Sequence, residues 1–314
     1  SLGIAVGEWV IETALGQAAL WRAEGFRIPV SVNIGARQLR QNDFPSRLKD
    51  LLARQPEVSP DFLELEVLET SALGDLVQVS RLLEECRAIG VNVALDDFGT
   101  GYSSLTYLKR LPAGVVKVDQ SFVRDILEDP DDLAILDGVL GLASAFGRQV
   151  IAEGVETPSH GDMLLRIGCE LGQGYGIARP MPAESLRDWI RHWQPSPRWA
   201  QLRRLNREYL PLLYTQVEHR AWIQELADAL RAGSRDLPKL IHDPAVFSRW
   251  MDESGFQPCP GFETVDRLHR QVHQSAGVLY ELHARGDIQA ACHRLDELIE
   301  LRDALSKALD DYLG

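Results

Sequence analysis

The sequence has few of the features that mark secreted, membrane-spanning or disulfide-stabilised proteins. Its four cysteines, Cys86, Cys169, Cys259 and Cys292, show no paired spacing, so the thiols are predicted to be reduced and disulfide bonds are not expected. No segment approaches the roughly 20 apolar residues that span a bilayer, and no signal peptide is visible. These absences favour a cytoplasmic location.

Positive charge is also scarce. The chain has 33 Lys and Arg against 46 Asp and Glu, which gives a net charge of -13 and a pI of about 5.1. Binding to a nucleic-acid polymer needs a basic surface, and this composition does not favour one. A small phosphorylated ligand held through metal ions stays compatible with it. The length of 314 residues predicts one large domain and one small domain.

Residues 1–193 alternate short apolar runs with helical patterns, which is typical of a parallel sheet covered by helices. The expected strands are Ile28–Ile34, Phe62–Leu68, Val91–Asp96, Val115–Asp119, Gln149–Glu153 and Glu170–Gly176. The expected helices are Glu8–Trp21, Gln38–Arg54, Leu73–Ile89, Ser103–Lys109, Asp131–Phe146, Ser159–Ile167 and Ala183–His192. Six strands could form an open sheet or part of a (β/α)8 barrel. Polar residues at the strand ends favour the barrel, because barrel enzymes place their chemistry there.

A proline-containing segment, Trp193–Arg198, interrupts the pattern. We expect residues 194–208 to connect the first domain to a helical domain over residues 209–314. The expected helices are Trp199–Arg231, Pro244–Asp252, Phe262–Arg285 and Asp287–Leu313, with Gly286 and Asp287 as the cap residues between the last two. Four helical segments with short connections predict an all-α four-helix bundle.

Two adjacent carboxylates, Asp96 and Asp97, end one strand and precede a glycine-rich turn. Neighbouring strand residues point to opposite faces, so both can reach one site only at a strand end, where the backbone turns. They repel each other unless a cation or a proton neutralises them. Alternation along the strands also sends one polar side chain inward near the end of each of five strands: Asn33, Glu66, Asp96, Lys117 and Glu153.

Such side chains are costly to bury unless they are paired or bind metal. A buried ion-pair network is one alternative. The other is a pair of hard cations such as Mg²⁺ or Mn²⁺, which prefer oxygen ligands. Two ions about 3.5–4 Å apart that share a carboxylate are the usual arrangement for phosphodiester hydrolysis. Asp96 is the natural bridging ligand, Asp97 would bind the second ion, and Lys117 could orient or deprotonate the attacking water and stabilise phosphate charge.

Residues 1–193 resemble the EAL-domain family of cyclic di-GMP phosphodiesterases. The resemblance rests on seven motifs in the family's order: Ser31-Val32-Asn33-Ile34, Leu65–Glu69, Asp96–Leu105, Val116–Asp119, Ala152–Glu156, Gln173–Tyr175 and Arg179-Pro180. It implies a modified (β/α)8 TIM-like barrel that hydrolyses cyclic di-GMP to linear pGpG with two Mg²⁺ or Mn²⁺ ions. The alternative is a catalytically inactive domain that binds cyclic di-GMP as a signalling effector. The full set of acidic residues and Lys117 favours hydrolysis.

The resemblance also implies a role for each matching residue. Asn33, Glu66 and Asp96 would bind the first metal, and Asp96, Asp97 and Glu153 the second. Lys117 would contact the catalytic water, and Glu69 would brace the loop Asp97–Ser104. The residues near the nucleotide would be Asp119, Glu156 and Gln173.

Three positions depart from the family pattern. The Glu-Ala-Leu signature, which supplies another metal-binding glutamate, is absent, so we expect the first two barrel strands to be missing from this chain. Leu68 replaces the usual threonine of one motif, and Gly35 replaces a serine of another.

Six of the eight histidines follow residue 215, which sets the second domain apart. His269 and His273 are four residues apart and lie on one face of a helix, while His219 precedes Trp222 on an earlier helix. Three histidines on facing helices can bind zinc. Taken singly, each histidine is better explained as an ordinary core or surface residue, and only the three together favour zinc.

This pattern resembles the CZB family of zinc-binding sensor bundles over residues 209–314. The matching segments are His219–Trp222, Phe247–Trp250 and His269–His273. The resemblance implies a cysteine ligand five residues before Trp250, where Ala245 stands. His242, one helical turn earlier, is the expected substitute, and Cys259 is a weaker candidate. The bundle is thus expected to sense zinc for the phosphodiesterase or to mediate a homodimer. A third possibility makes the bundle the main functional part and the barrel its platform.

Overall fold

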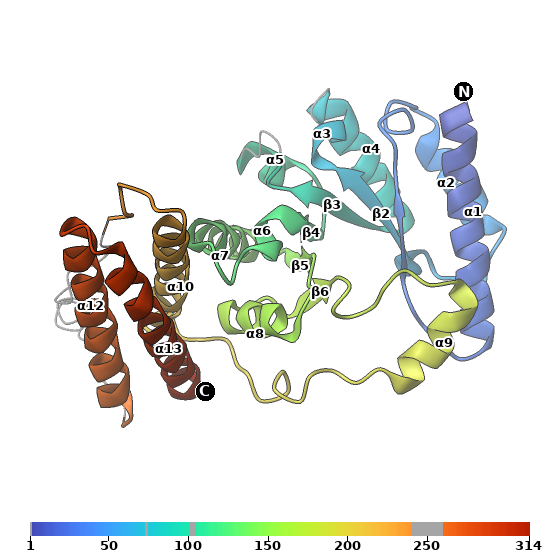
Figure 1. The fold of residues 1–314 in the computed structure, drawn as a ribbon. Coiled ribbons are helices and arrows are strands. Elements are labelled where there is room, and N and C mark those ends of the chain that lie inside the picture. Colours follow the sequence, from blue (N-terminus) through green and yellow to red (C-terminus); the bar gives the residue numbers. More distant parts are fainter. Residues whose placement is uncertain (1, 73–74, 101–104, 240–259) are drawn as a thin grey trace. The chain divides into compact units, whose positions relative to one another are not determined.

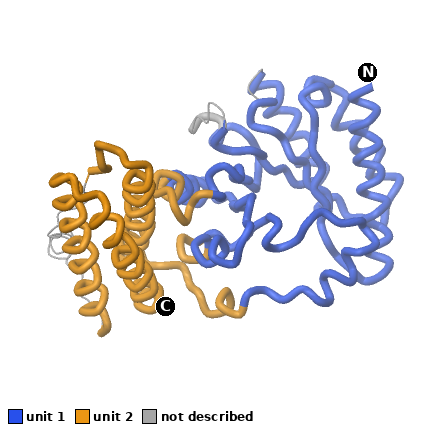
Figure 2. The backbone as a smooth tube through the Cα atoms, viewed as in Figure 1, with its two compact units in different colours: residues 1–124, 135–164, 169–196 blue, residues 125–134, 165–168, 197–314 orange. Residues whose placement is uncertain are grey.

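The computed structural model describes residues 2–72, 75–100, 105–239 and 260–314. The chain divides into two compact units (Figure 2). Unit 1 comprises residues 1–124, 135–164 and 169–196, and unit 2 comprises residues 125–134, 165–168 and 197–314. Two short segments of the first 196 residues therefore cluster with the C-terminal helices.

Unit 1 is built on a six-stranded sheet (Figure 1). The strands are β1 (Val30–Asn33), β2 (Leu63–Leu68), β3 (Asn92–Phe98), β4 (Val115–Val118), β5 (Gln149–Glu153) and β6 (Leu171–Gln173). Every neighbouring pair is parallel, and the strand order follows the chain order. A doubly wound sheet would reverse its strand order partway, whereas a barrel sheet does not. The predicted parallel sheet is confirmed, and it has the topology of a partial barrel.

Helices connect the strands, as parallel pairing requires. The longer connecting helices are α2 (Phe44–Ala53), α4 (Leu76–Ile89), α5 (Leu105–Arg110), α7 (Pro130–Ala145) and α8 (Pro158–Ile167), while α1 (Leu2–Ala23) precedes the sheet and α9 (Ala183–His192) follows it in the chain. Short helical turns add η1 (Pro60–Phe62), α3 (Glu69–Ala72) and α6 (Gln120–Arg124). The prediction that a helix begins at Gln38 was wrong, because α2 begins at Phe44 with Pro45 in its first turn. Proline favours that position, since its missing N–H needs no helical partner there.

The strands of the sheet alternate between an apolar face and a polar face. Leu65, Val93, Leu95 and Val116 are almost fully buried and belong to the apolar set. Residues of opposite parity on these strands include Glu66, Asp96 and Lys117, which are also buried. Because side chains alternate across a strand, the polar set shares one face of the sheet. This face carries the candidate site.

The described residues of unit 2 form three long helices: α10 (Leu210–Arg231), α12 (Phe262–Ala284) and α13 (Ile288–Leu313). They share an apolar core that includes Trp222, Leu226, Leu279 and Leu298. The turn between α12 and α13 is as predicted: Gly286 has a φ of 79°, and the Asp287 carboxylate accepts a hydrogen bond from Ala290 N at 3.1 Å.

The long helix expected from Trp199 begins only at Leu210, with Pro211 in its first turn. The expected helix Pro244–Asp252 lies outside the described residues. Among the cysteines that the structure describes, Cys86, Cys169 and Cys292 are free thiols.

In the described part of the chain, no helix is both long enough and apolar enough to cross a membrane.

Candidate metal centres

The ammonium group of Lys117 on β4 lies among carboxylates from three other strands. Its Nζ atom is 3.0 Å from Glu66 Oε1, 3.1 Å from Asp96 Oδ1 and 2.6 Å from Glu153 Oε1. The structure thus brings together four of the side chains that alternation places on one face. A single buried cation offsets only part of the negative charge of three carboxylates, and charges in such a place need partners.

The protonation of Lys117 decides what it can do chemically. Burial acts to lower the pKa of this ammonium group, but the hydrogen bond to Glu153 and the charges of Glu66 and Glu153 outweigh burial and raise it. Lys117 is therefore a cation at neutral pH. In this arrangement it can donate hydrogen bonds and stabilise negative charge, but it holds no lone pair to accept a proton.

Asp97 reaches the same region through an unusual backbone conformation. Its φ is 53°, the one positive value among the described non-glycine residues, and the β3–β4 register shifts between Leu95 and Phe98. Such an irregularity turns a side chain that would otherwise face away. The expectation that β3 ends at the aspartate pair was wrong, since the strand continues to Phe98. The turn that lets both carboxylates face one site lies inside the strand.

Carboxylate oxygens of Asp96, Asp97 and Glu153 lie within 4.8 Å of one another. Burial, followed by repulsion from Asp96 and Asp119, raises the pKa of Asp97. Burial also raises the pKa of Glu153, against the opposing effect of Lys117. Converging oxygen ligands with excess negative charge fit a hard divalent cation such as Mg²⁺ or Mn²⁺.

Glu69 lies at the base of the loop after β3. It is 1 % exposed, and its Oε2 atom accepts a hydrogen bond from Gly99 N at 3.2 Å. Gly99 has a φ of 107°, and a Cβ atom there would lie 2.6 Å from the Phe122 ring, so only glycine fits. Glu69 thus holds the first part of the loop that it was predicted to brace, while residues 101–104 lie outside the described chain.

Four further candidates lie around this face of the sheet. Asn33 on β1 is in register with Glu66, and Gln173 on β6 is in register with Glu153. Asp119 follows β4 and accepts a hydrogen bond from Ser121 N at 2.9 Å. Glu156 is exposed three residues after Glu153. Asn33 and Gln173 are thus sheet neighbours of two carboxylates that contact Lys117, while Asp119 and Glu156 follow Lys117 and Glu153 by two and three residues in the chain.

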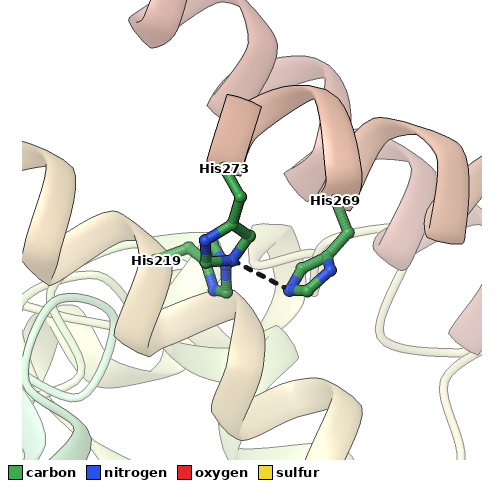
Figure 3. A group of neighbouring side chains, drawn as sticks. All are labelled: His219, His269 and His273. Carbon is green, nitrogen blue, oxygen red and sulfur yellow. Dashed lines mark hydrogen bonds between the residues drawn. The ribbon is translucent and has the colours of Figure 1, made fainter. Parts of the chain in front are cut away.

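A second candidate centre lies between α10 and α12 (Figure 3). His219 Nε2 is 3.0 Å from His273 Nε2, which is 3.2 Å from His269 Nε2. All three side chains are buried. His219 Nδ1 lies 2.8 Å from Thr215 O, so this nitrogen carries the proton and leaves Nε2 as the ligand atom.

The two Nε2–Nε2 distances are compatible with ligands of one zinc ion, and one ligand atom of each histidine lies within 4.8 Å of the other two. A tetrahedral ion with Zn–N bonds of about 2.0–2.1 Å separates its ligands by roughly 3.3 Å, close to the spacing seen here. These are the same three histidines that the sequence predicted as zinc ligands. His242, the fourth predicted ligand, lies outside the described residues.

Sequence reasoning passed over two polar residues beside His219. Gln216 is 6 % exposed and donates from Nε2 to Ser306 Oγ at 2.8 Å, while Arg220 donates to the same oxygen at 3.0 Å. The sequence could have indicated them only through their spacing from His219, which Gln216 precedes by three residues and Arg220 follows by one. Their partners on α13 are 90 and 86 residues away in the chain, so the sequence could not identify them.

Asp97→Asn is expected to make the metal-free protein slightly more stable, by less than about 1 kcal/mol, because solvent screens much of the charge on this partly exposed carboxyl. Because the folded protein raises the pKa of Asp97, ionisation of this carboxyl opposes folding. The gain should therefore be present at pH 7 and disappear below about pH 3, where Asp97 is protonated in both states. Asparagine also tolerates positive φ. Urea unfolding in the presence of a chelator measures the effect.

The matched control for this variant is Asp50→Asn on the exposed face of α2, which should change stability little. Equal effects of the two substitutions, or a loss of stability in Asp97→Asn, would contradict the repulsion inferred for Asp97.

Comparison with known proteins identifies the family to which the first part of the chain is similar. The family model described as EAL domain matches residues 1–180. The bifunctional diguanylate cyclase/cyclic di-GMP phosphodiesterase MucR of Pseudomonas aeruginosa is 40% identical over 184 residues, which are 58% of this chain and 27% of the relative. Cyclic di-GMP phosphodiesterase PA2567 of the same organism is 39% identical over 186 residues, 59% of this chain and 32% of the relative.

A solved structure of the PaMucR phosphodiesterase in complex with c-di-GMP superimposes with a TM-score of 0.56 at 40% identity, covering 59% of this chain and 75% of that one. The chain spans about a third or less of the length of the curated relatives named above. Since the family model covers more than half of the sequence, the chain belongs to the EAL domain family.

Proposed function

We propose that this protein hydrolyses cyclic di-GMP to linear pGpG. The observation that carries the proposal is the cluster in which Lys117 contacts Glu66, Asp96 and Glu153 while the backbone turns Asp97 toward the same place. A domain that only bound the nucleotide would not need this costly concentration of buried charge. The relatives named as cyclic di-GMP phosphodiesterases support the choice of substrate.

The residues divide into metal ligands and groups that act on the substrate. Asn33, Glu66 and Asp96 would hold one Mg²⁺ or Mn²⁺ ion, and Asp96, Asp97 and Glu153 the other. When bound, such ions lower the pKa of a water molecule and neutralise charge on the phosphodiester.

Lys117 would orient the water or the phosphate oxygen by donating a hydrogen bond, and it would stabilise negative charge on the phosphate. Glu69 holds the loop through Gly99 N, which keeps the aspartate pair in place. Asp119, Glu156 and Gln173 are the candidates for contacts with the nucleotide. Each of these roles is compatible with the position that the side chain has in the structure.

The partial barrel and the helical unit complete the proposal. Two further strands beside the edge strands β1 and β6 would close the modified (β/α)8 barrel. In unit 2, His219, His269 and His273 would bind Zn²⁺, with His242 as a fourth ligand and residues 244–252 as part of a four-helix bundle. This bundle would regulate hydrolysis or join two copies of the chain in a homodimer.

The decisive experiment is an assay of cyclic di-GMP turnover. The protein, with any sequence that precedes Ser1 in its gene, is incubated with cyclic di-GMP and Mg²⁺ or Mn²⁺, with and without Zn²⁺, and products are separated by chromatography. We expect pGpG to form only with Mg²⁺ or Mn²⁺. Nucleotide binding without product, measured by calorimetry, would instead support an effector that does not hydrolyse its ligand.

A further inference from the structure

One face of α10 joins the three-histidine centre to a polar network. Gln216, His219 and Arg220 occupy positions i, i+3 and i+4, so their side chains leave the helix on the same side. Gln216 and Arg220 both donate to Ser306 Oγ on α13, at 2.8 and 3.0 Å. The rotation of α10 about its axis therefore determines both the position of the His219 ring and the two hydrogen bonds to Ser306.

Arg220 has a second partner outside the three long helices. Its Nη1 atom donates to the main-chain oxygen of Leu127 at 3.0 Å. Leu127 lies in residues 125–134, one of the two early segments that cluster within unit 2 (Figure 2). A guanidinium that binds both a hydroxyl and a backbone oxygen fixes the distance between them, because its N–H groups have a rigid planar geometry.

The other early segment is held in a similar way. Arg166, in residues 165–168, is 3 % exposed, and its Nη1 atom lies 2.6 Å from Asp310 Oδ1 on α13. Gln216 Nε2 donates to the same carboxylate oxygen at 3.3 Å. The side chains next to His219 thus contact, directly or through one shared acceptor, both segments that come from the first 196 residues.

We propose that Arg220 is a positioning residue that couples metal binding at the three histidines to residues 125–134. This coupling rests on the proposed zinc site. A zinc ion bound by His219 on α10 and by the two histidines on α12 would fix the rotation of α10. The guanidinium of Arg220 would then keep its hydrogen bond to Leu127 O. Residues 125–134 directly follow α6, which begins beside Asp119 at the end of β4. The chain therefore leads from the histidine centre to the strand that carries Lys117.

Hydrogen–deuterium exchange of the full chain tests this coupling without measuring hydrolysis. The protein is loaded with Zn²⁺, its zinc content is verified by elemental analysis, and half of it is treated with a chelator. In the wild type, removal of zinc should raise amide exchange over residues 125–134 by about tenfold or more, since a charge-assisted hydrogen bond is lost. In Arg220→Met, exchange there should be fast in both states, with zinc content unchanged.

Arg270→Ala is the matched control. Arg270 follows His269 as Arg220 follows His219, but its side chain is 64 % exposed and its guanidinium pairs with Asp266 on its own helix. In Arg270→Ala, amide exchange over residues 125–134 should respond to zinc as it does in the wild type. Arg220→Lys, which keeps the charge but not the fork, should respond partially, and it also serves if Arg220→Met does not fold.

Four results would overturn the coupling. If zinc does not change amide exchange over residues 125–134 in the wild type, the two sites are not coupled. If zinc changes this exchange in Arg220→Met as much as in the wild type, Arg220 does not couple them. Loss of zinc from Arg220→Met would make Arg220 a support for the metal site rather than a relay. Wild-type protein that binds no zinc would overturn the proposed zinc site together with the coupling, so the two failures are distinguishable.

Discussion

Replacing Asp96 by asparagine should reduce cyclic di-GMP hydrolysis by at least about 10³-fold, the order expected when a ligand shared by two catalytic ions is removed. Asp96 Oδ1 lies 3.1 Å from Lys117 Nζ, and its carboxylate lies close to those of Asp97 and Glu153. The amide keeps the size of the side chain but removes the charge. Turnover at saturating Mg²⁺ or Mn²⁺, with Mn²⁺ binding followed by calorimetry, measures the change.

Glu64→Gln is the matched control. Glu64 lies on the same face of β2, two residues before Glu66, but its carboxylate accepts a hydrogen bond from Ser31 Oγ at 2.9 Å instead of contacting Lys117. Turnover should stay within about threefold of the wild type, as for substitutions away from a reaction centre. Wild-type turnover in Asp96→Asn would refute the assignment of Asp96 as the shared ligand.

His273→Ala should lower the affinity for zinc by at least about 100-fold, because even residues that only orient a ligand change affinity by about 10–100-fold. His273 is the middle member of the cluster, with Nε2 3.0 Å from that of His219 and 3.2 Å from that of His269. Its loss removes the ligand that lies between His219 and His269. Elemental analysis after dialysis and a competition titration against a chromogenic chelator measure the effect.

His293→Ala controls for the removal of a histidine as such, since His293 is exposed on α13. This variant should bind zinc as the wild type does. Zinc should also raise the melting temperature of the wild type and of His293→Ala, because a ligand that binds only the folded state stabilises it. Unchanged zinc content in His273→Ala would remove His273 from the ligand set.

Much of the sheet could be predicted from the sequence because its strands obey simple alternation. Apolar residues such as Leu65 and Val116 alternate with Glu66 and Lys117, and this period assigned the inward face. The histidine centre was predictable for a related reason, since His269 and His273 have helical spacing. In both cases a local repeat determines which way the side chains point.

Other features depend on contacts that no local pattern encodes. The start of α10 at Leu210 rather than Trp199 shows that polar residues compatible with a helix do not by themselves extend one. The positive φ of Asp97 inside β3 breaks the alternation on which the strand prediction relied. Arg220 and Leu127 are 93 residues apart in the chain, and only the folded structure brings them together.

The backbone at Asp97 restricts how this family member can change over evolutionary time. At a φ of 53°, glycine, asparagine and aspartate are the residues that the chain accepts at low cost. Asparagine and glycine are each one nucleotide substitution away from an aspartate codon, and neither carries a carboxylate. A descendant could therefore lose the Asp97 carboxylate, a proposed metal ligand, in a single mutational step and keep its fold, so inheritance of the fold alone does not guarantee inheritance of the chemistry.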